Sequence, residues 1–149
     1  MQEISRGDEA PDFRADSTQG KISLKDYRGK NLVLYFYVKD QTPGCTMQSC
    51  SLRDGIEKLK AHNAEVLGIS VDGLDSHNKF AFKYNLNFPL VADPDFKISK
   101  AYNVFNEERQ MSRRVTFLID KNGMITHIFP KVDVQAHAEE VVEVLKSIK

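Results

Sequence analysis

The chain has 149 residues, of which 41% are hydrophobic and 28% are charged, as in an ordinary globular protein. Lysine plus arginine and aspartate plus glutamate both number 21, so the formal net charge is zero, and nothing in it indicates binding to nucleic acid or to an anionic membrane. A chain of this length is most simply one domain, residues 1–149, with its own core.

The first residues lack the apolar core of a signal peptide, and the longest apolar runs have the length of strands. We therefore expect a cytoplasmic protein without a membrane span. The two cysteines are Cys45 and Cys50. Because the cytosol keeps thiols reduced, we expect any disulfide between them to be transient and redox-linked, not structural.

The first thirty residues are punctuated by Pro11, Gly20 and Gly29, which favours a small N-terminal hairpin. An apolar, β-prone run over residues 32–38 then predicts a buried strand.

A helix is predicted over residues 43–61. Thr42 is a preferred N-cap residue, and Pro43 suits the first helical position. Gly55 lies inside this helix and should weaken it by about 1 kcal/mol relative to alanine.

The rest of the chain alternates strands and helices and closes with a hairpin and a helix. The predicted elements are a strand over 64–71, a helix capped by Asp75 or Ser76 and reaching Tyr84, a strand over 88–92, a helix near 96–102, a strand over 114–119, a turn at Asn122-Gly123 into 124–129, and a helix over 135–148. This order predicts an α/β fold with a mixed central β-sheet flanked by helices.

Cys45 is the main candidate for chemistry. It falls in the first turn of the helix predicted over residues 43–61, where free backbone N–H groups and the helix dipole stabilise an anion. The thiolate is the reactive form of cysteine. The competing interpretation, that Cys45 is a small buried apolar residue, is common for free cysteines but fits poorly with the polar residues around it.

Cys50 follows five residues later. On an intact helix, residues five apart have Cα atoms roughly 8–9 Å apart, whereas a disulfide needs less than about 7 Å. If both cysteines are helical, they can bond only after part of the helix unwinds. That Cys50 merely lies on the helix wall remains an equal alternative.

Two further residue types are candidates for the same site. Thr42 caps the helix in the ordinary interpretation, but its hydroxyl also suits a group that faces whatever approaches Cys45. Arg113 and Arg114 begin an otherwise apolar strand. They are either a solvated strand end or a cation beside the Cys45 thiolate.

The four histidines, His62, His77, His127 and His137, show no metal-ligand spacing with each other or with the cysteines, and two cysteines alone make a poor zinc site. We therefore expect no metal site. No phosphate-binding loop or serine nucleophile elbow is present. A cysteine–histidine hydrolase stays formally open because its partners need not be near in sequence.

Nearly the whole chain resembles the peroxiredoxins, specifically the bacterioferritin comigratory protein (PrxQ) subfamily. The residues that carry the resemblance include Ala10-Pro11-Asp12-Phe13, Thr42-Pro43-Gly44-Cys45-Thr46, Cys50-Ser51-Leu52-Arg53-Asp54, Gly68-Ile69-Ser70-Val71-Asp72, His77, Phe88-Pro89-Leu90 and Arg114-Val115-Thr116-Phe117-Leu118-Ile119-Asp120. Two positions depart from the family pattern: Val38 stands where a proline is usual, and Gln48 where many relatives carry glutamate.

This resemblance implies a thioredoxin-like fold and thiol-dependent reduction of hydrogen peroxide and organic hydroperoxides. It implies that Cys45 is the peroxidatic cysteine and that Cys50 is the resolving cysteine, which closes an intramolecular disulfide with Cys45. Thr42, Gly44, Cys45 and Arg114 would bind the peroxide. The reductant would be a thioredoxin-like protein, and no metal, haem or flavin cofactor would be required. Because both cysteines lie in one segment and their disulfide needs no partner subunit, we expect a monomer, with a dimer as the open alternative.

Two other functions remain open on the sequence. A thiol–disulfide oxidoreductase acting on proteins would ignore peroxide, and it usually has a Cys-x2-Cys spacing that this chain lacks. A redox-sensing binding module would react with peroxide but turn over poorly with any reductant.

Overall fold

The computed structural model describes residues 4–147. Its main sheet has seven strands in the order β2-β1-β5-β4-β3-β8-β9, and two further strands form a separate hairpin, β6-β7. The strands are β1 (Arg14–Ser17), β2 (Gly20–Ser23), β3 (Asn31–Phe36), β4 (Ala64–Ser70), β5 (Leu90–Ala92), β6 (Phe105–Asn106), β7 (Met111–Ser112), β8 (Val115–Ile119) and β9 (Ile125–Phe129). The helices are η1 (Leu24–Tyr27), α1 (Pro43–Asp54), α2 (Ile56–Ala61), α3 (Leu74–Lys83), α4 (Lys97–Ala101) and α5 (His137–Ser147).

The sheet is mixed. β3, β4 and β5 run parallel, whereas β8 pairs antiparallel with β3 on one side and β1 pairs antiparallel with β5 on the other. The parallel core requires helical crossovers, which α1, α2 and α3 supply. The α/β class, the mixed sheet and the N-terminal hairpin of β1 and β2 are therefore confirmed.

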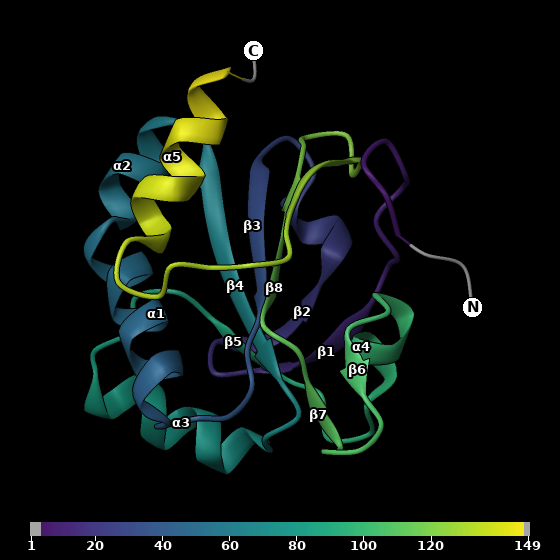
Figure 1. Cartoon of the computed structure of the whole chain (residues 1–149), viewed down its shortest axis with the longest axis vertical. Helices are drawn as coiled ribbons and strands as arrows, with labels where there is room; N and C mark the ends of the chain where they lie inside the picture. Colours follow the sequence, from purple (N-terminus) through teal and green to yellow (C-terminus); the bar gives the residue numbers. More distant parts are fainter. Residues whose placement is uncertain (1–3, 148–149) are drawn as a thin grey trace.

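β3 is buried on both faces and separates two apolar cores. Alternate residues Val33 and Tyr35 belong to the core under α1, α2 and α5, whereas Leu32, Leu34 and Phe36 belong to the core on the α4 side. This alternation follows from the two-residue period of a strand. Figure 1 shows α1, α2 and α5 stacked on one side of the sheet, with α4 and the β6-β7 hairpin on the other.

The structure corrects the helix predicted over residues 43–61. It is two helices, because α1 ends at Asp54 and α2 begins at Ile56. Gly55 lies against α5, where a Cβ atom would stand 2.5 Å from the Cβ of Ala138. The glycine therefore does more than weaken a helix, since it lets the junction of α1 and α2 approach α5.

The structure differs from the predicted elements in three smaller ways. The N-cap of α3 is Gly73, not Asp75 or Ser76. The β6-β7 hairpin was not predicted from its short, polar sequence. α5 begins at His137, and Ile148, expected at its end, lies outside the described residues. No helix among residues 4–147 is long and apolar enough to cross a membrane.

Candidate active site

Cys45 lies in the first turn of α1, at the end of the loop that leaves β3, and its side chain is fully buried. Thr42 is the N-cap residue, and the backbone N–H of Thr46 bonds to its carbonyl at 2.8 Å. The backbone N–H groups of Gly44 and Cys45 precede that bond, so the helix itself does not use them. Free N–H groups at a helix N-terminus stabilise an anion, and Cys45 lies among them.

Arg114 reaches this sulfur from the neighbouring strand. It immediately precedes β8, which pairs with β3, and its Nη2 donates to Cys45 Sγ at 3.3 Å. Gly44 makes room for the guanidinium, because a Cβ on Gly44 would stand 3.1 Å from that nitrogen. Arg113, the other candidate of the pair, is exposed and donates to the carbonyl of Asn103.

Gln48 completes the contacts of the guanidinium. Its side chain is fully buried, and its Oε1 accepts a hydrogen bond from Arg114 Nη1 at 2.8 Å. Cys45 and Gln48 are three residues apart on α1 and share one face of the helix. One guanidinium therefore holds the sulfur with one nitrogen and the Gln48 amide with the other.

The ordinary interpretation of the sequence is that the Thr42 hydroxyl caps the helix. In the structure it makes no such hydrogen bond. It donates instead to the carbonyl of Lys39 at 2.8 Å. Since a hydroxyl has one proton, Thr42 Oγ1 is left with acceptor capacity. Val38, one of the two positions where the sequence departs from the pattern it resembles, is half-buried and packs on the core beneath α1.

Cys50 is half-buried on the same helix as Cys45, and both thiols are free. α1 runs without interruption from Pro43 to Asp54, so both cysteines are helical. On helical geometry their Cα atoms are roughly 8–9 Å apart, which is beyond the reach of a disulfide.

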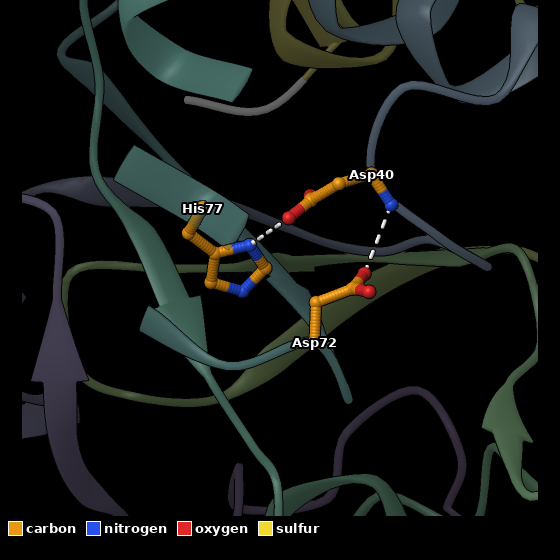
Figure 2. Close-up of side chains that lie close together, drawn as sticks. All are labelled: Asp40, Asp72 and His77. Atoms are coloured by element: carbon orange, nitrogen blue, oxygen red, sulfur yellow. Dashed lines mark hydrogen bonds and ion pairs between the residues drawn. The ribbon is translucent and has the colours of Figure 1, made fainter. Parts of the chain in front are cut away.

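The loop before Thr42 is held by a buried hydrogen-bond network that the sequence does not predict. Asp40 accepts hydrogen bonds from the hydroxyl groups of Tyr37 at 2.5 Å and Ser76 at 2.7 Å. His77 Nδ1 lies 2.7 Å from the same carboxylate, and the backbone N–H of Asp40 donates to Asp72 Oδ2 at 2.9 Å. Figure 2 shows these two contacts, one on each side of Asp40.

The network has the residue types of a metal site, since ligand atoms of Asp40, Asp72 and His77 lie within 4.8 Å of one another. Each of those atoms is already hydrogen-bonded. His77 Nε2 donates to the carbonyl of Val91 at 2.9 Å, and the ring's other nitrogen is hydrogen-bonded to Asp40. A metal ion would have to displace these hydrogen bonds, which account for the arrangement without an ion.

These network residues come from three segments. Asp40 follows β3, Asp72 follows β4, and His77 lies on α3. The available signal was the pair of aspartates after two adjacent parallel strands, whose carboxyl ends meet at one edge of a sheet. The network clamps the loop at Gln41, a non-glycine residue with a left-handed φ of 63°.

Two titratable side chains near Arg114 and Cys45 are uncharged at neutral pH. Burial lowers the pKa of His137 and the nearby charge of Arg114 lowers it further, although Glu140 opposes both. His137 therefore accepts from Thr116 Oγ1 at 2.8 Å and donates to Glu140 Oε1 at 3.0 Å. Burial is the main cause that raises the pKa of Tyr35, whose hydroxyl pairs with Ser49 at 2.8 Å.

The sequence of the chain matches a known protein family and named relatives over most of its length. The model of the AhpC/TSA family matches residues 6–128. The chain is 40% identical to peroxiredoxin Bcp of Bacillus subtilis over 152 residues, covering 97% of each protein.

Solved structures extend the likeness to the backbone. A cysteine mutant of Xylella fastidiosa PrxQ superposes with a TM-score of 0.91 at 33% identity, covering 99% of this chain and 98% of that one. The bacterioferritin comigratory protein of Xanthomonas campestris, described for its alkyl peroxide reduction activity, superposes with a TM-score of 0.85 at 32% identity, covering 91% and 90%.

These neighbours have the thioredoxin-like fold expected from the sequence. The family match spans most of the chain, and the Bacillus relative is covered almost completely. The chain therefore belongs to the AhpC/TSA family and is a peroxiredoxin of the Bcp (PrxQ) subfamily, a thiol-dependent peroxidase.

Proposed function

We propose that Cys45 is the peroxidatic cysteine and Cys50 the resolving cysteine of an atypical two-cysteine peroxidase recycled by a thioredoxin-like protein. The observation that carries this proposal is the 3.3 Å contact between Arg114 Nη2 and Cys45 Sγ in the first turn of α1. A guanidinium and free backbone N–H groups at one sulfur stabilise the thiolate and hold a polar substrate beside it.

In the first step the Cys45 thiolate attacks the terminal oxygen of a hydroperoxide. The S–O bond forms as the O–O bond breaks, and the departing oxygen leaves as water or an alcohol after it takes up a proton. Arg114 and the N–H groups of Gly44 and Cys45 stabilise the charge on that oxygen. Thr42 Oγ1 donates its own proton to the backbone carbonyl of Lys39, so it accepts a hydrogen bond from the hydroperoxide O–H.

In the second step the Cys50 thiol attacks the Cys45 sulfenic acid and releases water, which leaves an intramolecular disulfide. Because both cysteines are on an intact helix, this step requires the first turns of α1 to unwind. A dithiol reductant then returns both thiols by exchange and supplies two electrons. The whole cycle uses residues of one chain, so we propose that the enzyme acts as a monomer formed by a single domain.

We propose both hydrogen peroxide and alkyl hydroperoxides as substrates. The related Xanthomonas protein is described for alkyl peroxide reduction. Stopped-flow rates with hydrogen peroxide, tert-butyl hydroperoxide and cumene hydroperoxide test the preference. A chain that reacts with hydrogen peroxide alone would contradict the alkyl part of the proposal.

The proposed cysteine roles are tested by a thiol count with intact mass before and after one equivalent of hydrogen peroxide. We expect loss of both thiols and of two hydrogens in the wild type. Cys45→Ser should retain its remaining thiol, and Cys50→Ser should consume one equivalent and stop at the sulfenic acid or beyond. Steady turnover of Cys50→Ser with thioredoxin would refute the resolving role.

The reductant is tested by NADPH consumption with thioredoxin and thioredoxin reductase, with glutathione and glutaredoxin as the matched comparison. Turnover with thioredoxin supports the proposal. Reaction with peroxide but no turnover with either system would favour a redox sensor. Activity on protein disulfides together with indifference to peroxide would favour a thiol–disulfide oxidoreductase.

A further inference from the structure

The amide of Gln48 is not explained by packing. The side chain is fully buried, yet its Nε2 has no hydrogen-bond partner among residues 4–147. A buried donor without a partner costs free energy, and an apolar side chain of the same length would fill this space without that cost. The bond that the amide does make is the 2.8 Å contact from Arg114 Nη1 to its carbonyl oxygen.

That contact controls the direction of the guanidinium. Arg114 has its two terminal nitrogens on two different partners of α1, Gln48 Oε1 and Cys45 Sγ. The guanidinium is planar, so a fixed Nη1 also fixes where Nη2 points. Gly44, against which Nη2 lies, closes the space on the helix side.

The charge of the partner matters as much as its position. A carboxylate at residue 48 would make the same hydrogen bond, but it would pair with the positive charge of Arg114 and stand as a like charge beside the thiolate. An amide accepts from Arg114 and carries no charge. His137 and Tyr35, which lie near this region on α5 and β3, are uncharged near pH 7, so they do not cancel the arginine. The acidic groups that act on them are Glu140 and Asp133 beside His137, and Asp40 beside Tyr35, and the second thiol, Cys50, also acts on Tyr35. Among residues 4–147, the hydrogen bonds of Arg114 go to Gln48 and Cys45, and none goes to these groups.

We propose that Gln48 is a positioning residue of the peroxidase: it aims Arg114 at Cys45 and leaves the full arginine charge to the thiolate. This inference rests on the proposed roles of Cys45 and Arg114. It adds a specific consequence of the glutamine found here, namely that Cys45 is a thiolate at lower pH than it would be with glutamate at position 48.

The test is the pH profile of the second-order rate of Cys45 with hydrogen peroxide, followed by stopped-flow. In Gln48→Glu we expect the midpoint of the profile to move up by about one pH unit and the rate at pH 7 to fall about tenfold, because a like charge now faces the thiolate. Met47→Glu is the matched control, since it places the same charge one residue away on the exposed side of α1. Its midpoint should stay within a few tenths of a pH unit of the wild type.

Gln48→Met separates the orientation of the Arg114 guanidinium from the charge at position 48. It also provides a test if Gln48→Glu fails to fold. It keeps the length of the side chain and removes both polar atoms. We expect its plateau rate at high pH to fall about tenfold while the midpoint stays closer to the wild type than that of Gln48→Glu. A simple packing role would leave both the plateau and the midpoint unchanged in a folded variant.

The inference is overturned if Gln48→Glu has the midpoint of the wild type, or if Gln48→Met reacts as fast as the wild type. These outcomes differ from failure of the proposed function. If wild-type Cys45 does not react with peroxide at all, the roles of Cys45 and Arg114 fail first, whatever the variants do.

Discussion

The hydroxyl of Ser51 accepts a hydrogen bond from the backbone N–H of Ala138 at 3.2 Å. This contact joins the residue next to Cys50 to the first turn of α5. α1 is thus anchored near its C-terminal end, whereas its N-terminal turn carries Cys45. Any unwinding that brings the two cysteines together is opposed at the Cys50 side by this anchor.

Ser51→Ala should loosen that anchor. We expect the free energy of unfolding to fall by about 1 kcal/mol, because one hydrogen bond to a helix N–H is lost. Amide exchange over residues 46–51 should be faster in the reduced enzyme, as hydrogen-exchange mass spectrometry would show. Ser147→Ala is the control, since Ser147 is an exposed residue at the far end of α5. Equal protection of residues 46–51 in wild type and Ser51→Ala would contradict the anchor.

Gly55→Ala should destabilise the protein even though alanine is the better helix former. A Cβ at Gly55 would lie 2.5 Å from the Cβ of Ala138, so α1, α2 and α5 would have to separate. We expect a loss of about 1–3 kcal/mol in urea unfolding, as for other overpacked sites.

The double variant Gly55→Ala/Ala138→Gly isolates that contact, because it moves the methyl group from one side of the junction to the other. We expect it to be more stable than the sum of the two single changes by about 0.5 kcal/mol or more. If the changes in the free energy of unfolding were strictly additive, the two residues would not be in steric contact.

Gly44→Ala should impair catalysis more than stability. The new Cβ would lie 3.1 Å from Arg114 Nη2, the nitrogen that contacts Cys45 Sγ, so the guanidinium would have to shift. Displacing a group that holds the reacting atoms lowers the rate steeply, and we expect about a tenfold fall in the rate with hydrogen peroxide. A folded Gly44→Ala protein with the wild-type rate would show that Arg114 tolerates the displacement.

His137 should make the protein less stable in mild acid. Its pKa is lowered in the folded state, chiefly by burial, so the unfolded chain takes up a proton at a pH where the folded protein resists it. The free energy of unfolding should therefore fall as the pH drops from about 7 through the ordinary histidine pKa of 6.5 and below. Urea unfolding of His137→Gln should depend less on pH over this range, and a dependence as steep as that of the wild type would contradict the assignment.

Asp40→Asn should destabilise the fold strongly. Asp40 accepts from Tyr37 and Ser76 and is hydrogen-bonded to His77. Asparagine has one acceptor oxygen in place of two, so at least one of these partners loses its acceptor, and each buried polar group left without a partner costs about 1–3 kcal/mol. Asp72→Asn is the milder control, since Asp72 is only half-buried. A loss in Asp40→Asn no larger than in Asp72→Asn would show that Asp40 does not hold the network together.

Local sequence determined the elements that lie close to Cys45. The apolar run that became β3, the Thr42-Pro43 start of α1 and the place of Cys45 in its first turn all depend on interactions within a few residues. The same holds for the hairpin turn at Asn122-Gly123, where Gly123 has a positive φ of 83°. The motif resemblance then indicated the family.

Tertiary contacts decided what surrounds that cysteine. By residue type alone Arg113 and Arg114 are equal candidates, and only the family resemblance singled out Arg114; the pairing of β8 with β3 brings Arg114 to the sulfur. The Asp40 network joins three segments, with Asp40 and His77 37 residues apart in the chain, beyond the range of any local pattern. The break at Gly55 likewise depends on α5, more than 80 residues away, because burial and close packing join distant segments that sequence spacing does not relate.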